Sequence, residues 1–548
     1  MRPTASRRDA ALRAFLRSRR PRPVGRCAMC ALALLAAVTV VAPVSASRLT
    51  VPDDSPTIQG ALDALPDTVL VRSGRYAESL VLFSRVALLG IPEGPGFERP
   101  IVSGMTLGSV PGYVAEFRVR GLEFSGQIRT SCQDGPSQIV LENCRLRGGL
   151  LDLFESPDAT QLRIKGCQFD QDLVHTDGGL LVDSCVFQGS HLVAGGDDCG
   201  LTVKNSEFHG DGTRSAITIM TSELSEATVT GNLMEGYGSG LYLGVFHTLR
   251  IEDNVVRDMV GGGIGTGGAA RAYILRNRVE RCGGQYGIGT DRIDELVLQG
   301  NTVANCTGSG MLAMVSSRCA VVDNVVWGCR YYGIHLGEGG ASLLEVKNNT
   351  SSLNGWTGFQ SEVYVSGGRY EFEGNIGFGN GRYGVEWGVT EVTTVRCNDW
   401  FGNGLGTVNG LPMSSEDRAV DPQFCGAANG DFRLASTSPL VNPSGCGQVG
   451  ALGVGCNGTS RLTVLGQNPS RGPVRIEFEL AVPAAIEIDV FDLQGRRVAT
   501  LAQGTWPAGT HAVEWAGRSG SSRLAVGIYV VRYRHPGGED KRRIVLTP

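Results

Sequence analysis

The chain has 548 residues, of which 42% are hydrophobic and 78 are glycine, and its formal net charge is −4. A chain this long exceeds what one compact core usually holds, so two or more structural units are expected. The charge gives no electrostatic basis for binding nucleic acid, and the glycines lack the three-residue period of collagen.

Residues 1–46 are predicted to be an export signal. An arginine-rich start is followed by the apolar run CALALLAAVTVVAPV, and Val44-Ser45-Ala46 offers a small-residue cleavage site. The apolar run is shorter than the roughly 20 residues that a membrane-spanning helix needs. We therefore expect a secreted or outer-surface protein with no transmembrane segment in the mature chain. The alternative is an uncleaved anchor.

Cysteine usage fits an exported chain. The sequence has 15 cysteines, and loss of Cys27 and Cys30 with the signal would leave 13. An odd number means that at least one thiol stays free or pairs between chains. Cys446 and Cys456, near the end of the repetitive region described next, are the pair that we expect to be bridged.

The middle of the chain repeats a unit of the form apolar-x-x-Asn-x-apolar, as in IEDNVV, LQGNTV and VVDNVV. One such unit cannot bury its apolar side alone, so the units are expected to stack as a solenoid. Thirteen coils are visible. The residues at the asparagine position are Leu122, Cys144, Cys167, Cys185, Ser206, Asn232, Asn254, Asn277, Asn301, Asn324, Asn349, Asn375 and Asn398.

Equal positions of successive coils should form columns along the solenoid. The asparagines are expected to form a ladder of amide hydrogen bonds. A second column follows five residues later, and its cysteines are interpreted as small buried hydrophobes without bridges. This second column is Cys282, Cys306, Cys329, Asn354, Asn380 and Asn403. Glycines expected to form turns stand eight to ten residues after the asparagine position, at Gly240, Gly263, Gly287, Gly310, Gly333, Gly358 and Gly384.

The asparagine column and the opening segment TIQGALDALPDTVLVRSGRYAESLVL resemble right-handed parallel β-helix proteins of the pectate-lyase-like (pectin lyase fold) superfamily. The resemblance covers residues 48–456 and implies an all-β, single-stranded right-handed β-helix over residues 47–456. A short capping helix is expected from Thr57 to Leu65. The stretch from Asp421 to Asn442 is similar to segments that close such helices.

After a linker at 457–460, residues 461–548 show about seven short alternating strands with turn signals between them. This pattern predicts a small antiparallel β-sandwich. The pieces VFDLQGRRVATL, PAGTHAVEW and KRRIVLTP resemble the Ig-like C-terminal domains of type IX secretion cargo and of flagellar hook-capping proteins. The resemblance implies a sorting or anchoring role with the secretion machinery as partner. A plain structural sandwich is the alternative.

Candidate site residues lie on the outward face of the later coils. Two positions after each turn glycine, outward side chains should align as Tyr242, Gly265, Gly289, Leu312, His335, Gln360 and Glu386. The candidate catalytic residues are His335, Glu338, Glu362 and Glu386, because paired carboxylates serve glycoside hydrolysis. The candidate ligand-binding aromatic residues are Tyr331, Tyr332, Trp356 and Tyr383. Solvated surface groups and loop packing are the respective alternatives.

No cofactor is evident, although a carboxylate pair also suits calcium. The sequence lacks the Trp-x-Asp-His run of pectate lyases, the Gly-His-Gly of polygalacturonases and the Asp-Phe-Ile-Phe-Gly of pectin methylesterases. Three hypotheses stand: a protein that binds carbohydrate or another surface polymer, a polysaccharide lyase or glycoside hydrolase that uses the acidic patch, and a structural spacer or adhesin. Fold alone cannot choose among them.

Overall fold

The computed structural model describes residues 47–83, 85–91, 98–108, 115–130, 137–153, 161–176, 178–196, 200–221, 226–337, 342–362, 369–388, 392–410, 413–455, 462–465, 470, 473–480, 484–492, 494–507, 509–520, 522–535 and 538–547. The expected export signal and the 457–460 linker lie outside these ranges. In the described residues no helix is long and apolar enough to cross a membrane.

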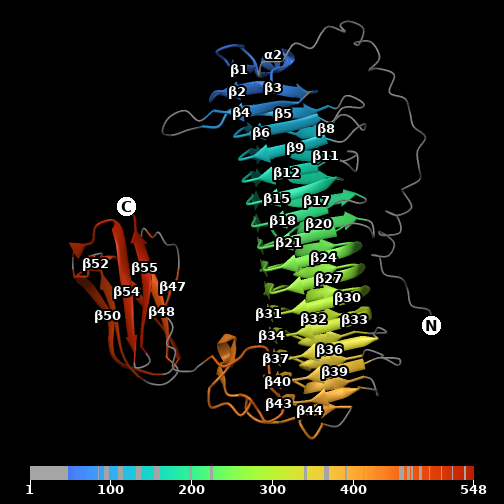
Figure 1. Ribbon diagram of the computed structural model, residues 1–548, viewed down its shortest axis with the longest axis vertical. Coiled ribbons are helices and arrows are strands. Elements are labelled where there is room, and N and C mark those ends of the chain that lie inside the picture. Colours follow the sequence, from blue (N-terminus) through green and yellow to red (C-terminus); the bar gives the residue numbers. More distant parts are fainter. Residues whose placement is uncertain are drawn as a thin grey trace. The chain divides into compact units, whose positions relative to one another are not determined.

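Residues 48–410 form a parallel β-solenoid (Figure 1). The expected capping helix follows the first strand as α2 (Ile58–Asp63), which is shorter than the expected Thr57–Leu65 because Thr57 is its N-cap. One face is a 16-stranded parallel sheet, called here the first sheet. Its strands are β1 (Arg48–Val51), β2 (Thr68–Val71), β4 (Val86–Gly90), β6 (Ala115–Arg120), β9 (Ser137–Glu142), β12 (Gln161–Lys165), β15 (Gly179–Asp183), β18 (Gly200–Lys204), β21 (Glu226–Thr230), β24 (Phe246–Glu252), β27 (Ala269–Leu275), β30 (Ile293–Gln299), β33 (Val315–Val322), β36 (Leu343–Lys347), β39 (Arg369–Glu373) and β42 (Thr394–Arg396).

Two further columns of short parallel strands complete each coil, and β3 (Arg75–Leu82) with β5 (Ile101–Leu107) precedes both. The second strand column is β7 (Glu123–Phe124), β10 (Arg145–Arg147), β13 (Gln168–Asp170), β16 (Val186–Gln188), β19 (Glu207–His209), β22 (Leu233–Glu235), β25 (Val255–Arg257), β28 (Arg278–Glu280), β31 (Thr302–Ala304), β34 (Val325–Trp327), β37 (Thr350–Ser352), β40 (Ile376–Phe378) and β43 (Asp399–Phe401). The third strand column is β8 (Ile128–Thr130), β11 (Leu150–Leu153), β14 (Leu173–Thr176), β17 (His191–Gly196), β20 (Ser215–Thr221), β23 (Ser239–Leu243), β26 (Ile264–Thr266), β29 (Tyr286–Thr290), β32 (Ser309–Ala313), β35 (Ile334–Leu336), β38 (Phe359–Ser361), β41 (Tyr383–Trp387) and β44 (Gly406–Asn409). These columns confirm the predicted solenoid of about thirteen coils.

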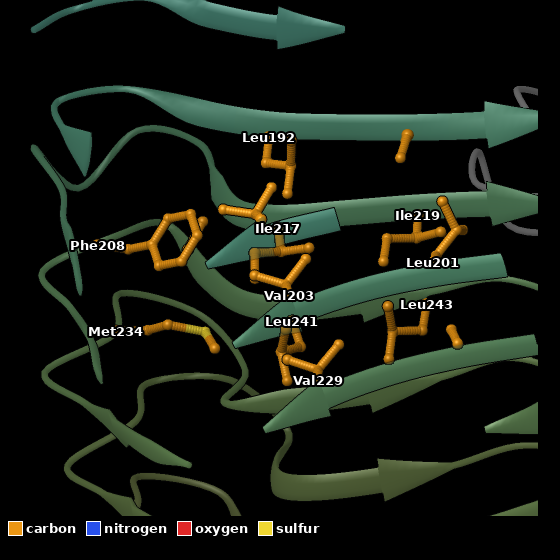
Figure 2. Packing of buried hydrophobic residues seen from close by; sticks show 14 of the residues in the cluster. Leu192, Leu201, Val203, Phe208, Ile217, Ile219, Val229, Met234, Leu241 and Leu243 are labelled. Atoms are coloured by element: carbon orange, nitrogen blue, oxygen red, sulfur yellow. The ribbon is translucent and has the colours of Figure 1, made fainter. Parts of the chain in front are cut away.

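The interior is a continuous apolar column. Side chains alternate in and out along each strand, so equal positions of successive coils stack inside. Figure 2 shows Phe208 above Met234 on one side, and Ile217 above Leu241 next to them. These residues are at most 2% exposed, so each coil contributes to the hydrophobic stabilisation of the fold by burying its apolar side chains.

The asparagine ladder is confirmed from Asn232 to Asn398. In each step the side-chain amide and the backbone N–H of one asparagine donate to the Oδ1 of the next, as from Asn301 to Asn324 at 3.0 and 2.9 Å. The residue before each position takes the left-handed conformation in most coils, which bends the chain around the amide. Asp417 Oδ1 ends the ladder by accepting from Asn398 Nδ2 at 3.0 Å.

The second column is also confirmed, and it extends further toward the N-terminus than the sequence indicated. Asn354 Nδ2 donates to Asn380 Oδ1, and Asn380 Nδ2 to Asn403 Oδ1, both at 3.0 Å. Its cysteines, Cys282, Cys306 and Cys329, are buried free thiols, as expected. Upstream the same position holds Asp172, which accepts from the Asp170 N–H at 2.7 Å and from the Gly149 N–H.

Four of the seven glycines expected to form turns lie inside strands instead, namely Gly240, Gly287, Gly310 and Gly384, and all seven are needed for packing space and not for positive φ. None of the seven expected glycines has a positive φ. A Cβ added to Gly333 would lie 1.9 Å from Ser351 Oγ, and one added to Gly310 would lie 2.1 Å from Val326 Cγ1. These glycines therefore leave room for interior side chains of the neighbouring coil.

The predicted Cys446–Cys456 bridge is wrong, because Cys446 is bonded to Cys397 with a Cα–Cα distance of 5.5 Å. Residues 413–455, called here the closing segment, fold back along the last coils and carry Cys446 to that position. The closing segment contains β45 (Phe424–Gly426), the 3-10 helix η1 (Ala427–Asn429) and β46 (Asp431–Leu434). Its Leu434, Leu440 and Val449 share a buried cluster with Ile376.

The C-terminal residues form two main antiparallel sheets, with strand orders β47-β48-β51 and β50-β49-β54-β55, and the two-stranded pair β52-β53. A separate buried cluster joins the two sheets, with Ile476 and Phe478 from one and Ile488 and Val531 from the other. The predicted antiparallel sandwich is thus observed. Its strands are β47 (Leu462–Leu465), β48 (Val474–Leu480), β49 (Ala484–Phe491), β50 (Arg497–Trp506), β51 (Gly509–Trp515), β52 (Arg518–Ser519), β53 (Ser522–Arg523), β54 (Gly527–His535) and β55 (Gly538–Leu546).

Candidate functional site

The outward residues of the third strand column align as the repeat predicts. Parallel pairing puts Leu312 opposite His335, His335 opposite Gln360, and Gln360 opposite Glu386. Tyr242, Gly265 and Gly289 continue the same row upstream. Each coil contributes one residue to this row, always from the same position of its strand. Residues of different chemistry therefore lie next to one another along the row.

His335 and Glu362 meet on this face. His335 Nε2 lies 3.4 Å from Glu362 Oε2, and Gln360 Nε2 donates to Glu362 Oε1 at 3.3 Å. The His335 side chain is 16% exposed and that of Glu362 is 41% exposed. The carboxylate therefore faces solvent while two neighbours on adjacent strands hold its orientation.

Glu386 is held by different groups. Thr357 Oγ1 donates to its Oε2 at 3.2 Å, and Asn409 Nδ2 donates to its Oε1 at 2.9 Å. Gln360 lies between His335 and Glu386 in the row and is only 6% exposed. Its Oε1 is a buried acceptor without a hydrogen-bond partner in the described residues. The acceptors that the site offers to solvent are therefore those of its two carboxylates.

Three aromatic rings surround this polar group. The Trp356 ring centroid lies 4.7 Å from that of Tyr331 and 5.1 Å from that of Tyr332. Tyr332 also contacts the His335 ring, at 5.1 Å, and the Arg382 guanidinium lies 5.3 Å from the Trp356 ring centroid. Trp356 remains 38% exposed, which is unusual for so large an apolar side chain.

The remaining two candidates are Tyr383 and Glu338. Tyr383 begins β41 and its ring lies beside Gly406 of the next coil, within 3.8 Å of where a Cβ would stand. Glu338 lies outside the described residues. The structure therefore gathers His335, Glu362, Glu386, Tyr331, Tyr332 and Trp356, and these six are called here the downstream cluster.

The electrostatics link the carboxylates to the phenols. Partial burial and then the negative charges of Glu386 and Glu362 raise the pKa of Tyr332. Burial and the Glu362 charge likewise raise the pKa of Tyr286, one coil upstream of the cluster. Both phenols therefore stay protonated at neutral pH and can donate a hydrogen bond.

Among the described residues, no group of three or more His, Cys, Asp and Glu side chains is placed to hold a metal ion. Sequence reasoning did not select Gln360, Thr357, Arg382 and Asn409 as site residues. The row position marks Gln360 and Asn409, whereas Thr357 and Arg382 reach the cluster from turns.

Comparison with known proteins supports the fold. Residues 173–376 match the family model described as right handed beta helix region, in agreement with the expected handedness. No curated protein matches. A solved structure of a mutant tailspike protein of E. coli bacteriophage HK620, in complex with hexasaccharide, is similar over 89% of this chain and 88% of its own, at 12% identity and a TM-score of 0.34.

Two epimerases show a similarly loose likeness. The A-module of a mannuronan C-5 epimerase from Azotobacter vinelandii matches 67% of this chain and 96% of its own, at 13% identity and a TM-score of 0.29. A mutant of the periplasmic alginate epimerase AlgG matches 69% and 83%, at 11% identity and a TM-score of 0.27. Similarity this low does not extend to the chemistry of a site.

Proposed function

We propose that this chain is a secreted or surface-exposed protein that binds a hydroxyl-rich polysaccharide at the downstream cluster. The observation that carries the proposal is the partly exposed Trp356 ring packed against Tyr332, whose phenol in turn lies within the electrostatic reach of Glu386 and Glu362. An aromatic face bordered by fixed polar groups suits a sugar ring, which has an apolar face and a rim of hydroxyls.

The charges favour an uncharged polymer over an anionic one. Glu362 and Glu386 both act on the Tyr332 phenol, so they lie on the same patch and repel a ligand carboxylate there. Their oxygens accept hydrogen bonds and match the donors that hydroxyl groups supply, and the Glu362 side chain is 41% exposed.

The test is retention of the full mature chain on xyloglucan, galactomannan, dextran and amylose. We expect Trp356→Ala to weaken retention about tenfold, because the loss of a stacked aromatic surface costs more than about 1 kcal/mol. Tyr273→Ala is the matched control, since Tyr273 is an aromatic residue on the first sheet. Equal retention of the wild type and Trp356→Ala would show that the polymer does not bind at the downstream cluster.

Cleavage of the polymer is a second candidate function, and the contact between His335 and Glu362 favours it. A histidine paired with a carboxylate suits proton transfer, and Glu386 supplies a second carboxylate. New reducing or unsaturated ends in the same incubations would reveal it. Glu362→Gln and Glu386→Gln should abolish those ends while retention persists, whereas retention without new ends would leave binding alone. If the protein is neither retained on the polymers nor cleaves them, a structural spacer is favoured.

The cellular location rests on the predicted export signal and on the resemblance of the C-terminal sandwich to sorting domains. We propose that residues 1–46 direct export and that residues 461–548 contact the secretion machinery. Deletion of residues 461–548 should leave the chain inside the cell envelope, as fractionation would show. Unchanged export of the truncated chain would exclude a sorting role.

A further inference from the structure

A second polar group lies far upstream on the same outward row. Arg129 pairs with Asp152, and Asp152 pairs with His175, on three consecutive coils. His175 Nδ1 lies 3.4 Å from Asp152 Oδ1, and the two side chains are 27% and 33% exposed. These three residues are called here the upstream cluster.

The upstream cluster differs in hydrogen-bond character from the downstream cluster. Arg129 is exposed, and no hydrogen bond or ion pair joins it to another group in the described part of the chain. A guanidinium has five N–H donors and no acceptor, so Arg129 offers donors where Glu362 and Glu386 offer acceptors. Asp152 partly offsets its charge, which leaves a site for hydroxyl oxygens more than for an anion.

One uninterrupted row joins the two clusters. From His175 the register runs through Val193, Thr218, Tyr242, Gly265, Gly289 and Leu312 to His335. These seven coil steps correspond to about 34 Å at the usual strand spacing. The row is therefore long enough for several sugar rings laid end to end.

The middle of the row is low and bordered by aromatic rings. Gly265 and Gly289 carry no side chain, and a Cβ placed on them would meet Tyr242 at 3.9 Å and Tyr286 at 3.5 Å. Tyr242 is 46% exposed. The row thus alternates a flat floor with exposed ring surface, which suits a chain of pyranose rings.

We infer that Arg129, Asp152 and His175 form a second subsite, and that one hydroxyl-rich polymer chain lies along the row and contacts both clusters. This inference rests on the proposed function at the downstream cluster. It adds that the ligand is a long, unbranched chain along the contact stretch, since branches there would meet the side chains that flank the row. The donor-rich and acceptor-rich ends give the bound chain a preferred direction.

The experiment uses the full mature chain and length-sorted fragments of whichever of the four polymers it retains. Short fragments fill the downstream cluster alone, whereas long fragments span all seven coil steps. We expect long fragments to bind more tightly, and Arg129→Ala and Asp152→Asn to weaken only the long fragments, by about tenfold, as loss of a charged hydrogen bond implies. Arg163→Ala is the matched control, an exposed arginine on β12 of the first sheet.

A second variant tests the path between the clusters. Gly265→Leu should fold, because the φ of Gly265 is not positive and an added Cβ meets only atoms at 3.6 Å or beyond. Its outward side chain should lower the affinity for long fragments and leave short ones unaffected. Equal affinity of long and short fragments, or no effect of Arg129→Ala beyond that of Arg163→Ala, would overturn the second subsite while the downstream site stands. Loss of all fragment binding in the wild type would overturn both.

Discussion

Asn324 is a side chain whose whole hydrogen-bonding capacity is used inside the solenoid. Its Nδ2 donates to Leu298 O at 2.8 Å and to Asn349 Oδ1 at 2.9 Å, and its Oδ1 accepts from Asn301. The residue is fully buried. A ladder of this kind turns a polar side chain into a structural element, because each amide satisfies the backbone of the preceding coil.

Asn324→Ala should therefore lower the free energy of unfolding by about 1–3 kcal/mol, since the Asn301 donors lose their acceptor in the interior. Chemical denaturation would measure the change. Gln299→Ala provides the control, because Gln299 is an exposed residue whose bond to Asp323 is on the surface. A loss equal to that of the control would show that the ladder contributes little.

Asp399 makes the stability of the last coil dependent on pH. Burial raises the pKa of its carboxyl to about 7, although Arg418 opposes the shift. Since this folded-state pKa exceeds the unfolded value, the ionised form is disfavoured in the fold. The stability it contributes is fully present below the unfolded pKa and is lost as pH rises through about 7.

Asp399→Asn should remove this dependence. In the wild type, Asp399 Oδ1 accepts from the Val420 N–H at 2.9 Å, and Asp399 Oδ2 has no hydrogen-bond partner in the described residues. The Oδ1 of an asparagine would still accept from Val420, and replacing Oδ2 breaks no hydrogen bond. Between pH 5 and 8, thermal melting should show the variant gaining on the wild type by on the order of 3 kcal/mol. If the difference in stability between the variant and the wild type stays constant over this pH range, the pKa of the Asp399 carboxyl is not raised by burial.

At the scale of elements, the closing segment covers the part of the second strand column that has become aromatic. The outward position that holds Arg257 and Glu280 in earlier coils becomes Trp327 and Phe378 in later ones. Phe432 lies 5.9 Å from Trp327, and Phe424 lies 5.4 Å from Phe378. The segment therefore buries apolar surface that the coils alone would leave exposed.

The Cys397–Cys446 bond fixes this arrangement over a separation of 49 residues. By loop-closure entropy, Cys446→Ala should lower the free energy of unfolding by about 4 kcal/mol. Cys397→Ala and the double variant should give the same loss, because all three remove one bond. If the free energy of unfolding fell much more in the double variant than in either single variant, each cysteine side chain would stabilise the fold independently of the bond.

At the scale of the molecule, each coil of the solenoid contacts mainly its two neighbours, and this makes the structure modular. Arg278 pairs with Thr302, so residues 278–301 are one complete coil of the 24-residue spacing between Asn277 and Asn301. The interior columns on either side of this coil carry the same kinds of residue.

Deletion of residues 278–301 should accordingly leave a folded solenoid, because Thr302 takes the place of Arg278 and the ladder continues. Circular dichroism and cooperative thermal unfolding would show it. Deletion of residues 290–301, about half a coil, is the control and should prevent folding, since it rotates every later column out of register. Similar behaviour of the two deletions would contradict nearest-neighbour stacking.

The sequence alone determined the columns, because a parallel solenoid converts spacing directly into proximity. The asparagine ladder, the free stacked cysteines and the row from Tyr242 to Glu386 all follow from counting residues. It could not determine contacts made by segments outside the repeat. The Cys397–Cys446 bond and the aromatic cover over Trp327 arise because the closing segment folds back, and no period encodes that path.

The same division holds for the site. Spacing placed His335, Gln360 and Glu386 in one row and Glu362 on the same patch, whereas only the tertiary structure showed which of these side chains touch, as His335 and Glu362 do at 3.4 Å. Side chains on turns depend on local backbone direction, which varies from coil to coil. Positions inside the strands were thus fixed by the repeat, whereas the turns that complete the site were decided by packing.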